Sequence, residues 1–450
     1  MKTGLNRVLG FILAVVMVLG GVAAAESGTD FEYVLLVDGT AMITGYNGSG
    51  QELVFPETLD GHTVTGLGSN FGVGTTAIKN IRSITVPDTM TTIEPGALRF
   101  AEYLEEIRTG GDHPVFSFTD GVLYNKQKQS LALYLQGNRA EHFDVPEGIR
   151  EIEDLAFLRA KLVSVRLPGS VERIGRECFY QCAFLAEASL SEGLRSIDAD
   201  AFTNCDKLRT IVIPASVTDI AESVFTDAHL KEIRVAEGNP VFTISDGALI
   251  NIRDGVLIAF PHYSEAESCV IPEGVTRIGN LAFYACHHLK QVTFPDGLLE
   301  IGHGAFLMCN HLEAIDLPDS VIRLEDSAFM RNSDVKYLRL PAGLTEIVSN
   351  FEDMSITGLE IPESVRVIDR SFYSLPNLTE VVIPDSVSTI SHDSFAYCKN
   401  LAVITIPASV TEIGCRFAGC SDSLVIRTEK GSYAEQYCRD NGMNWEYIPE

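Results

Sequence analysis

The sequence predicts a β-rich solenoid of short stacked repeats, capped at both ends. Three observations carry this prediction. One motif recurs about twelve times at a spacing of about 23 residues. Within each copy, apolar and polar residues alternate with the period of a β-strand. A single copy is also too small to fold alone, so the copies are expected to stack on one another.

Residues 289–311 show the motif in full. It reads L-x-x-[IV]-x-[IVLF]-P-x-x-[VL]-x-x-I-x-x-x-A-F-x-x-C-x-x, and Leu312 begins the next copy. About six side chains per copy would be buried, at roughly 1.5–3 kcal/mol each. Ordering about twenty residues costs about 1.5 kcal/mol per residue. The total cost over the copy exceeds the total gain from burial. Only a stack of copies can therefore be stable.

A proline after the first strand of each copy sets the register of the array. Steps between these prolines cluster at about 23 residues, with shorter steps of about 21 and 22 towards the C-terminus. Ser191 and Ala236 take the place of the proline in two divergent copies. The prolines are Pro87, Pro146, Pro168, Pro214, Pro272, Pro295, Pro318, Pro341, Pro362, Pro384 and Pro407.

Each copy should contribute one parallel strand to a continuous sheet. Val292 and Phe294 face the core while Gln291 and Thr293 face outward, because side chains alternate along a strand. Pro295 ends this strand at no cost in ladder hydrogen bonds.

A second short strand should follow the turn in each copy. Leu298 and Ile301 return to the core from this strand, and Ala305 and Phe306 fill the far side. The outward side chains are thus all that is free to recognise a ligand.

Residues 1–25 have the three parts of a secretory signal peptide. Lys2 and Arg7 give a positive start, residues 8–22 are apolar, and small residues precede a cleavage site before Glu26. The alternative is an uncleaved anchor, although the apolar run is short for a span and contains glycines. No later run reaches membrane length. We expect a secreted or cell-surface protein without a transmembrane segment after cleavage.

The array should be capped at both ends. Residues 26–63 fit the motif poorly and are expected to form an N-terminal β cap that covers the first open edge. Residues 427–450 are expected to form a C-terminal cap, with a helix near 431–442 and Trp445 sealing the open end.

The solenoid itself is expected over residues 64–426, with two hairpin inserts near 110–140 and 237–265. Phe116–Asn125 resembles Phe242–Asn251, and each segment is followed by a second apolar run. A ligand-binding excursion is one interpretation. Structural variation is favoured, because the same pattern occurs twice.

The formal net charge of -27 argues against nucleic acid as a partner, because such a chain repels phosphate backbones. An acidic surface also keeps an extracellular protein soluble.

The ten cysteines invite disulfides in an exported protein. Cys182 and Cys205 are one repeat apart, as are Cys286 and Cys309, so a ladder of inward-facing reduced thiols is the favoured interpretation. Pairing between adjacent copies stays open, because rungs lie about 5 Å apart. Cys178–Cys182 and Cys415–Cys420 are alternative pairs within a repeat.

The sequence predicts neither a metal site nor an enzyme. Cys286-His-His288 and Cys309-Asn-His311 suggest a metal cluster, but the register places the cysteines inward and the histidines outward. No catalytic triad, nucleophile elbow or phosphate-binding loop is present. The many carboxylates occupy turn positions, where Asp and Gly are good turn formers. No cofactor is expected.

The repeats resemble the BspA-type bacterial leucine-rich repeat family. Residues 211–220, 381–390 and 404–413 carry the resemblance most clearly, and it extends over roughly residues 43–448. It implies a leucine-rich repeat array in an exported or surface-exposed bacterial protein that contacts other proteins, with adhesion to host matrix proposed for some members. It implies no shared catalytic residues.

The outward side of the first strands is the candidate binding face, because such a row often lines a concave binding surface in a curved solenoid. Tyr337 and Arg339 are the first choice, since Tyr and Arg anchor interfaces. An ordinary solvated face is the alternative. The candidate residues are Arg166, Arg234, Gln291, Thr293, Asp316, Tyr337, Arg339, Glu360 and Glu380.

Three functions follow from this organisation. The first is a non-enzymatic module that binds a protein or glycan at the cell surface or in the extracellular matrix, with adhesion as one such role. The second is a structural or self-associating surface protein without a specific ligand. The third, an enzyme with activity in the paired inserts, has least support from the sequence.

Overall fold

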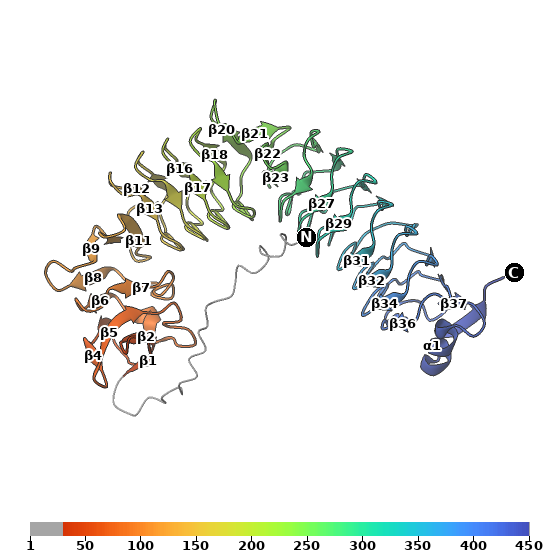
Figure 1. The fold of residues 1–450 in the computed structure, drawn as a ribbon, viewed down its shortest axis with the longest axis horizontal. Helices are drawn as coiled ribbons and strands as arrows, with labels where there is room; N and C mark the ends of the chain where they lie inside the picture. Colours follow the sequence, from red (N-terminus) through yellow and green to blue (C-terminus); the bar gives the residue numbers. More distant parts are fainter. Residues whose placement is uncertain (1–29, 450) are drawn as a thin grey trace. The chain divides into compact units, whose positions relative to one another are not determined.

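The computed structural model describes residues 30–449, so the predicted signal peptide lies outside the described residues. The chain divides into two compact units, residues up to 114 and residues from 115 on. Strands dominate both units (Figure 1). The array is a β-solenoid, as predicted, with about 18 turns.

The number of turns exceeds the predicted twelve or so because strand pairing continues where the motif fades. At the C-terminal end, β37 (Val425–Thr428) pairs in parallel with β38 (Asn444–Tyr447), although neither is followed by the Ala-Phe-x-x-Cys segment. Backbone hydrogen bonds make these turns, and they need no particular side chain.

The first unit contains two small sheets. β1 (Phe31–Leu35) and β2 (Ala41–Tyr46) form an antiparallel pair, and β2 continues in parallel to β5 (His62–Leu67) and β7 (Thr92–Ile93). β4 (Thr58–Leu59) forms an antiparallel pair with β5, and a 3₁₀ helix spans Ala77–Asn80. The second sheet is β3 (Glu52–Val54), β6 (Ser83–Val86) and β8 (Glu106–Thr109), all parallel.

Each regular turn of the second unit has a first strand and a second strand, and a strand that pairs with its equivalent in a neighbouring turn does so in parallel. The first strands do not form the continuous sheet that the sequence predicts, because among the described residues they divide into five separate short sheets. The first strands are β12 (His142–Asp144), β14 (Ser164–Arg166), β16 (Glu187–Ser189), β18 (Thr210–Ile213), β20 (Glu232–Val235), β24 (Ser268–Val270), β26 (Gln291–Thr293), β28 (Ala314–Asp316), β30 (Tyr337–Arg339), β33 (Glu380–Val382), β35 (Val403–Ile406), β37 and β38. The second strands are β13 (Glu151–Ile152), β15 (Arg173–Ile174), β17 (Ser196–Ile197), β19 (Asp219–Ile220), β25 (Arg277–Ile278), β27 (Glu300–Ile301), β29 (Arg323–Leu324), β31 (Glu346–Val348), β32 (Val367–Asp369), β34 (Thr389–Ser391) and β36 (Glu412–Ile413).

Both inserts are three-stranded antiparallel meanders whose last strand joins the sheet of second strands. The first insert is β9 (Phe116–Thr119), β10 (Val122–Asn125) and β11 (Ser130–Tyr134), and β11 pairs in parallel with β13. The second insert is β21 (Phe242–Ser245), β22 (Ala248–Asn251) and β23 (Val256–Ala259), and β23 pairs with β25. Each insert therefore supplies the second strand of one turn.

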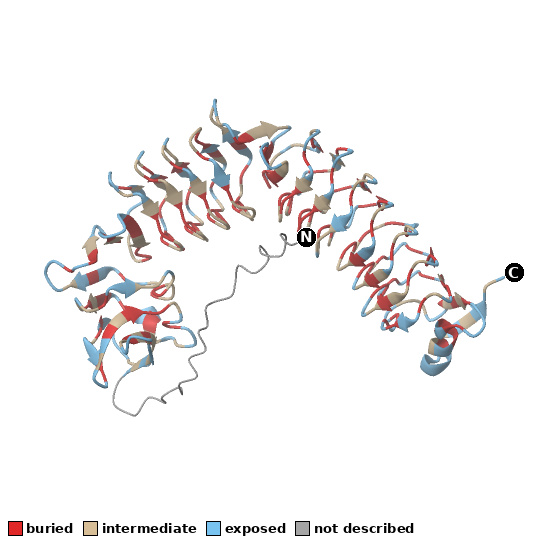
Figure 2. Cartoon of the chain, in the orientation of Figure 1, coloured by how far each residue is buried: buried red, intermediate tan, exposed pale blue. Residues whose placement is uncertain are grey.

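The buried residues of the motif form the core, and buried positions recur in every turn of the second unit (Figure 2). Leu298, Ile301 and Phe306 are fully buried, as the pattern predicts, whereas Val292 and Phe294 are only partly buried. The phenylalanines at the position of Phe306 stack from turn to turn. Ring centroids lie 4.6 Å apart for Phe283 and Phe306.

The cysteines are unpaired in the structure, and all but half-buried Cys420 are buried. All ten cysteines are free thiols. The thiol of Cys309 donates a hydrogen bond to the carbonyl of Phe283 at 2.9 Å, and Cys182 makes the equivalent bond to Phe157 at 3.0 Å. Each of these carbonyls also accepts a backbone hydrogen bond, from Ala160 to Phe157 at 2.9 Å and from Cys286 to Phe283 at 3.3 Å, so the thiol is its second donor.

The C-terminal segment forms helix α1 (Tyr433–Asn441), which begins at the N-cap Ser432 and ends at Gly442 with a positive φ of 66°. Ala434 and Cys438 are its fully buried residues, while Tyr433 is exposed. Trp445 on β38 is partly buried against the core.

Candidate interaction face

The first-strand face consists of the outward side chains of the first strands in the second unit. On β26 these are Gln291 and Thr293, and both are exposed. Eight of the nine candidate residues belong to this face, whereas Glu360 is exposed but does not lie on a strand. Its segment contains Gly358, which has no side chain to pack on a pleated sheet and weakens a strand.

The structure brings five of the candidates together on consecutive turns. β24 pairs with β26 so that Val270 lies opposite Thr293, and β28 pairs with β30 so that Asp316 lies opposite Arg339. The turns of β26 and β28 are joined by a 3.0 Å bond from the backbone N–H of Glu313 to the carbonyl of Lys290. We call the set Val270, Gln291, Thr293, Asp316, Tyr337 and Arg339 the central patch.

Arg339 is held in a fixed position within the central patch. Its guanidinium donates to the carbonyl of Leu317 at 2.6 Å and to the carboxylate of Asp319 at 2.9 Å, and it lies 3.5 Å from Asp316. The contacts to Leu317 and Asp319 come from the previous turn and were not predicted, because the strand register describes which way a residue faces and not which loop group it reaches.

Tyr337 stands beside this fixed arginine with 52% of its surface exposed. Its neighbour across the ladder is Ala314, which is too small to cover the ring. About half of the Tyr337 surface is therefore open to solvent, on the same side of β30 as a guanidinium whose charge is already balanced.

The other candidate arginines also have carboxylate partners on the same face. Arg234 donates to Glu232 at 2.6 Å, and this bond holds the pKa of Glu232 below its usual value. Arg166 lies 3.8 Å from Asp144. Glu380 lies 3.4 Å from Arg427. The face is thus nearly neutral in an acidic protein.

Exposed valines extend the face beyond the predicted residues. Val212, Val270 and Val382 occupy the same outward strand position as Thr293, and each is well exposed. The strand register could have identified them, because β-branched residues at an outward position stand out from the polar residues expected there.

Within residues 30–449, no helix is long and apolar enough to cross a bilayer. Over the same residues, no group of three or more His, Cys, Asp and Glu side chains is placed to hold a metal ion. His311, predicted to face outward, is exposed and lies 3.0 Å from Asp334.

These features define a repeat protein with a buried, repetitive core and a variable outward face. The model of the BspA-type leucine-rich repeat region matches residues 132–252, 258–374 and 367–448, with six copies. The chain belongs to this family. No curated protein matches the sequence.

Solved structures of bacterial leucine-rich repeat proteins are similar over most of the chain. The pneumococcal vaccine antigen PcpA is 20% identical, with a TM-score of 0.51, and the match covers 93% of this chain and 96% of PcpA. A leucine-rich cell surface protein of Faecalibacterium prausnitzii is 22% identical, with a TM-score of 0.47 and coverage of 92% and 97%. A leucine-rich repeat protein of Bacteroides ovatus is 21% identical, with a TM-score of 0.45 and coverage of 95% and 100%. At this identity, the likeness to PcpA shows a shared fold.

Proposed function

We propose that the protein is an exported interaction module that binds a protein or glycan partner through the first-strand face, with the central patch as its anchor. Membership of a family of repeat modules for protein interaction supports this proposal. Such folds typically serve as non-enzymatic binding scaffolds.

The observation that supports the proposal is that exposed Tyr337 and fixed Arg339 share the outward side of β30. A half-exposed tyrosine supplies contact area at low cost in side-chain entropy. Arg339 is already ordered by Leu317 and Asp319, so little further entropy is lost when a partner covers it. Preorganised aromatic and arginine side chains are typical binding hot spots.

The test is capture of a partner from matrix and cell-wall extracts by immobilised protein. We expect the double variant Tyr337→Ala, Arg339→Ala to lose the captured species. Tyr433→Ala is the matched control, because Tyr433 is 47% exposed but lies on helix α1. Equal capture by the double variant and the unaltered protein would contradict the assignment of this face.

Export is supported by the sequence of residues 1–25. We expect the mature protein to begin at Glu26, which N-terminal sequencing of material secreted by a bacterial host can check. Retention of Met1 in that material would rule out a cleaved signal.

Self-association is the second candidate function, and β1 is the observation that favours it. Among residues 30–449 this strand pairs only with β2, and Val34 and Leu35 are both exposed on it. An apolar edge strand is a template for pairing with a second copy of the chain. Concentration-dependent growth in light scattering that Val34→Lys abolishes would support this function, and a concentration-independent mass would exclude it.

A further inference from the structure

The second insert interrupts the core of the second unit. Side chains of β22 alternate between two separate clusters, because Leu249 packs with the turns before the insert while Ala248 and Ile250 pack with the turns after it. All four residues of β22 are buried. The insert is therefore a partition with a core on each side.

The stacked rings are interrupted at the same place. One stack runs from Phe157 to Phe225 and another from Phe260 to Phe395, and among the described residues no ring contact joins Phe225 to Phe260. The sheet of second strands also ends at β19 and begins again with the insert. We call residues 223–226 together with residues 256–262 the joint.

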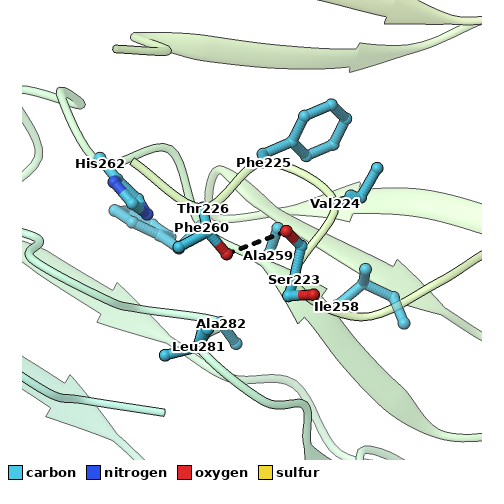
Figure 3. A pocket seen from close by; sticks show the side chains of 10 residues that line it. All are labelled: Ser223, Val224, Phe225, Thr226, Ile258, Ala259, Phe260, His262, Leu281 and Ala282. Carbon is cyan, nitrogen blue, oxygen red and sulfur yellow. Dashed lines mark hydrogen bonds between the residues drawn. The ribbon is translucent and has the colours of Figure 1, made fainter. Parts of the chain in front are cut away.

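A small void lies in the joint, with a volume of about 10 Å³, which is about the space of one water molecule. Figure 3 shows the ten residues that line it, from the turn before the insert, the end of the insert and the turn after it. The hydroxyl of Thr226 donates its hydrogen to the carbonyl of Ser223 at 2.9 Å. The remaining lining is mostly apolar.

His262 also lines this void, and it is an unusual residue for such a place. Only 5% of its surface is exposed, and its Nδ1 atom has no hydrogen-bond partner. A buried polar atom without a partner is costly, and a buried charge without a partner is far more so. The closed joint therefore accommodates His262 only as a neutral ring.

The groups around His262 offer no compensation for a positive charge. His229 from the turn before and His287 from the turn after both oppose its protonation, and the ring of Tyr284 lies 5.5 Å away. The charged groups lie one layer further out. Asp206 is 3.9 Å from His229, Asp227 acts on His287 and Tyr284, and Arg209 lies over Tyr263.

We propose that the joint is acid-labile and opens locally when His262 takes up a proton, while the stacks on either side stay folded. Opening exposes the imidazole to water, where it can be protonated, and separates the two cores at the plane where no ring stack joins them. Within each stack the rings stay in contact from turn to turn, and this holds even between β29 and β31, where the sheet of second strands breaks once more.

The expected size of the effect follows from proton linkage. Burial lowers the pKa of His262 from its ordinary value of 6.5 to about 3 in the closed joint. At pH 4.5 the open form therefore gains a proton that the closed form does not. Because pH 4.5 is two units below 6.5, the equilibrium constant for opening is about 100-fold higher there than at neutral pH.

Hydrogen–deuterium exchange of the full chain at pH 7.5 and 4.5, corrected for the chemical dependence of exchange on pH, tests the proposal. We expect protection of amides in the joint to fall by about 100-fold more than that of amides between Phe306 and Asn332, which lie inside a stack. In His262→Leu this excess should vanish, whereas His303→Leu, at an exposed turn histidine, should keep it.

An excess that persists in His262→Leu, or a uniform loss of protection along both stacks, would overturn the proposal. If His262→Leu does not fold, His262→Gln provides the same comparison with a neutral polar side chain. The ion pair between Glu222 and Arg277 also spans this region and is unchanged in these variants, so an excess that persists in His262→Leu would assign the acid response to that pair instead of to His262.

Discussion

Glu222 accepts hydrogen bonds from the guanidinium of Arg277, although the two residues are 55 positions apart in the sequence. One of these bonds measures 3.2 Å, and the same carboxylate accepts a 2.8 Å bond from the backbone N–H of Asn280. Glu222 follows β19 and Arg277 begins β25, so the pair connects the last turn before the second insert with the first turn after it.

Loss of this connection should destabilise the protein. The two side chains are only 28% and 23% exposed, so their hydrogen bonds are partly shielded from water. We expect Glu222→Ala to lower the free energy of unfolding by about 2 kcal/mol, as for a hydrogen bond to a charged group. Urea unfolding followed by circular dichroism measures this change.

Glu172→Ala is the matched control. Glu172 pairs with Arg150 in the same way, but the side chains are 40% and 57% exposed. An exposed ion pair contributes less than about 1 kcal/mol. Equal losses of unfolding free energy in the two variants would show that the ion pair across the insert stabilises the protein no more than an exposed pair does.

The stacked rings make a second prediction. Phe306 is fully buried between Phe283 at 4.6 Å and Phe329 at 5.0 Å. We expect Phe306→Ala to cost about 3–5 kcal/mol, because it leaves a cavity in the middle of a stack. Phe184→Ala removes a ring that is 56% exposed, so denaturant unfolding should show little change for it. A loss below about 1 kcal/mol for Phe306→Ala would contradict this view of the core.

The sequence predicts the buried part of each turn well, and for a physical reason. Leu298, Ile301, Phe306 and Cys309 have to match their equivalents one turn away, so the repeat spacing alone identifies them as inward. The two inserts are detectable as breaks in that spacing. The role of the second insert as a partition is not, since it depends on two opposite faces of β22 packing against two separate cores.

The first-strand face is less predictable for the converse reason. Its residues are not constrained to repeat, so the register tells only that Tyr337 and Arg339 point outward. The groups that accept hydrogen bonds from Arg339 are the loop carbonyl of Leu317 and the carboxylate of Asp319. The positions of both groups follow from the turn geometry, which the register does not describe. The fold can therefore be read from the motif, whereas the ligand cannot.

Asn332 takes the place of a ladder cysteine and makes a third prediction. Its side-chain amide donates to the carbonyls of Phe306 at 3.0 Å and Phe329 at 2.7 Å, while its own oxygen has no partner. We expect Asn332→Ala to cost about 2 kcal/mol, because both carbonyls lose a donor. Asn332→Cys should cost less, since a thiol restores the donor that Cys309 provides to Phe283. Thermal unfolding should rank the variants in that order, and the reverse order would be inconsistent with a donor ladder.

The ladder cysteines make the last prediction, which concerns pH. Burial raises the pKa of Cys182 and of Cys398 from 9.0 to about 12. At pH 8 about one in ten thousand of these thiols is ionised, and the thiolate is the reactive form. We expect the native protein to react very slowly with Ellman's reagent, and half-buried Cys420 to react first. In denaturant without reductant, all ten thiols should react at once.

The raised pKa of the buried thiols also predicts how stability changes at alkaline pH. The folded state holds the thiol protons more tightly than the unfolded chain, so their contribution to stability is complete below pH 9 and is lost as pH rises from 9 towards 12. Cys182→Ala should therefore flatten the fall in unfolding free energy over that range, whereas Cys420→Ala, at the half-buried position, should flatten it less. Few titratable thiols in the denatured protein would instead establish disulfides between neighbouring rungs, and both variants would then expose an unpaired cysteine.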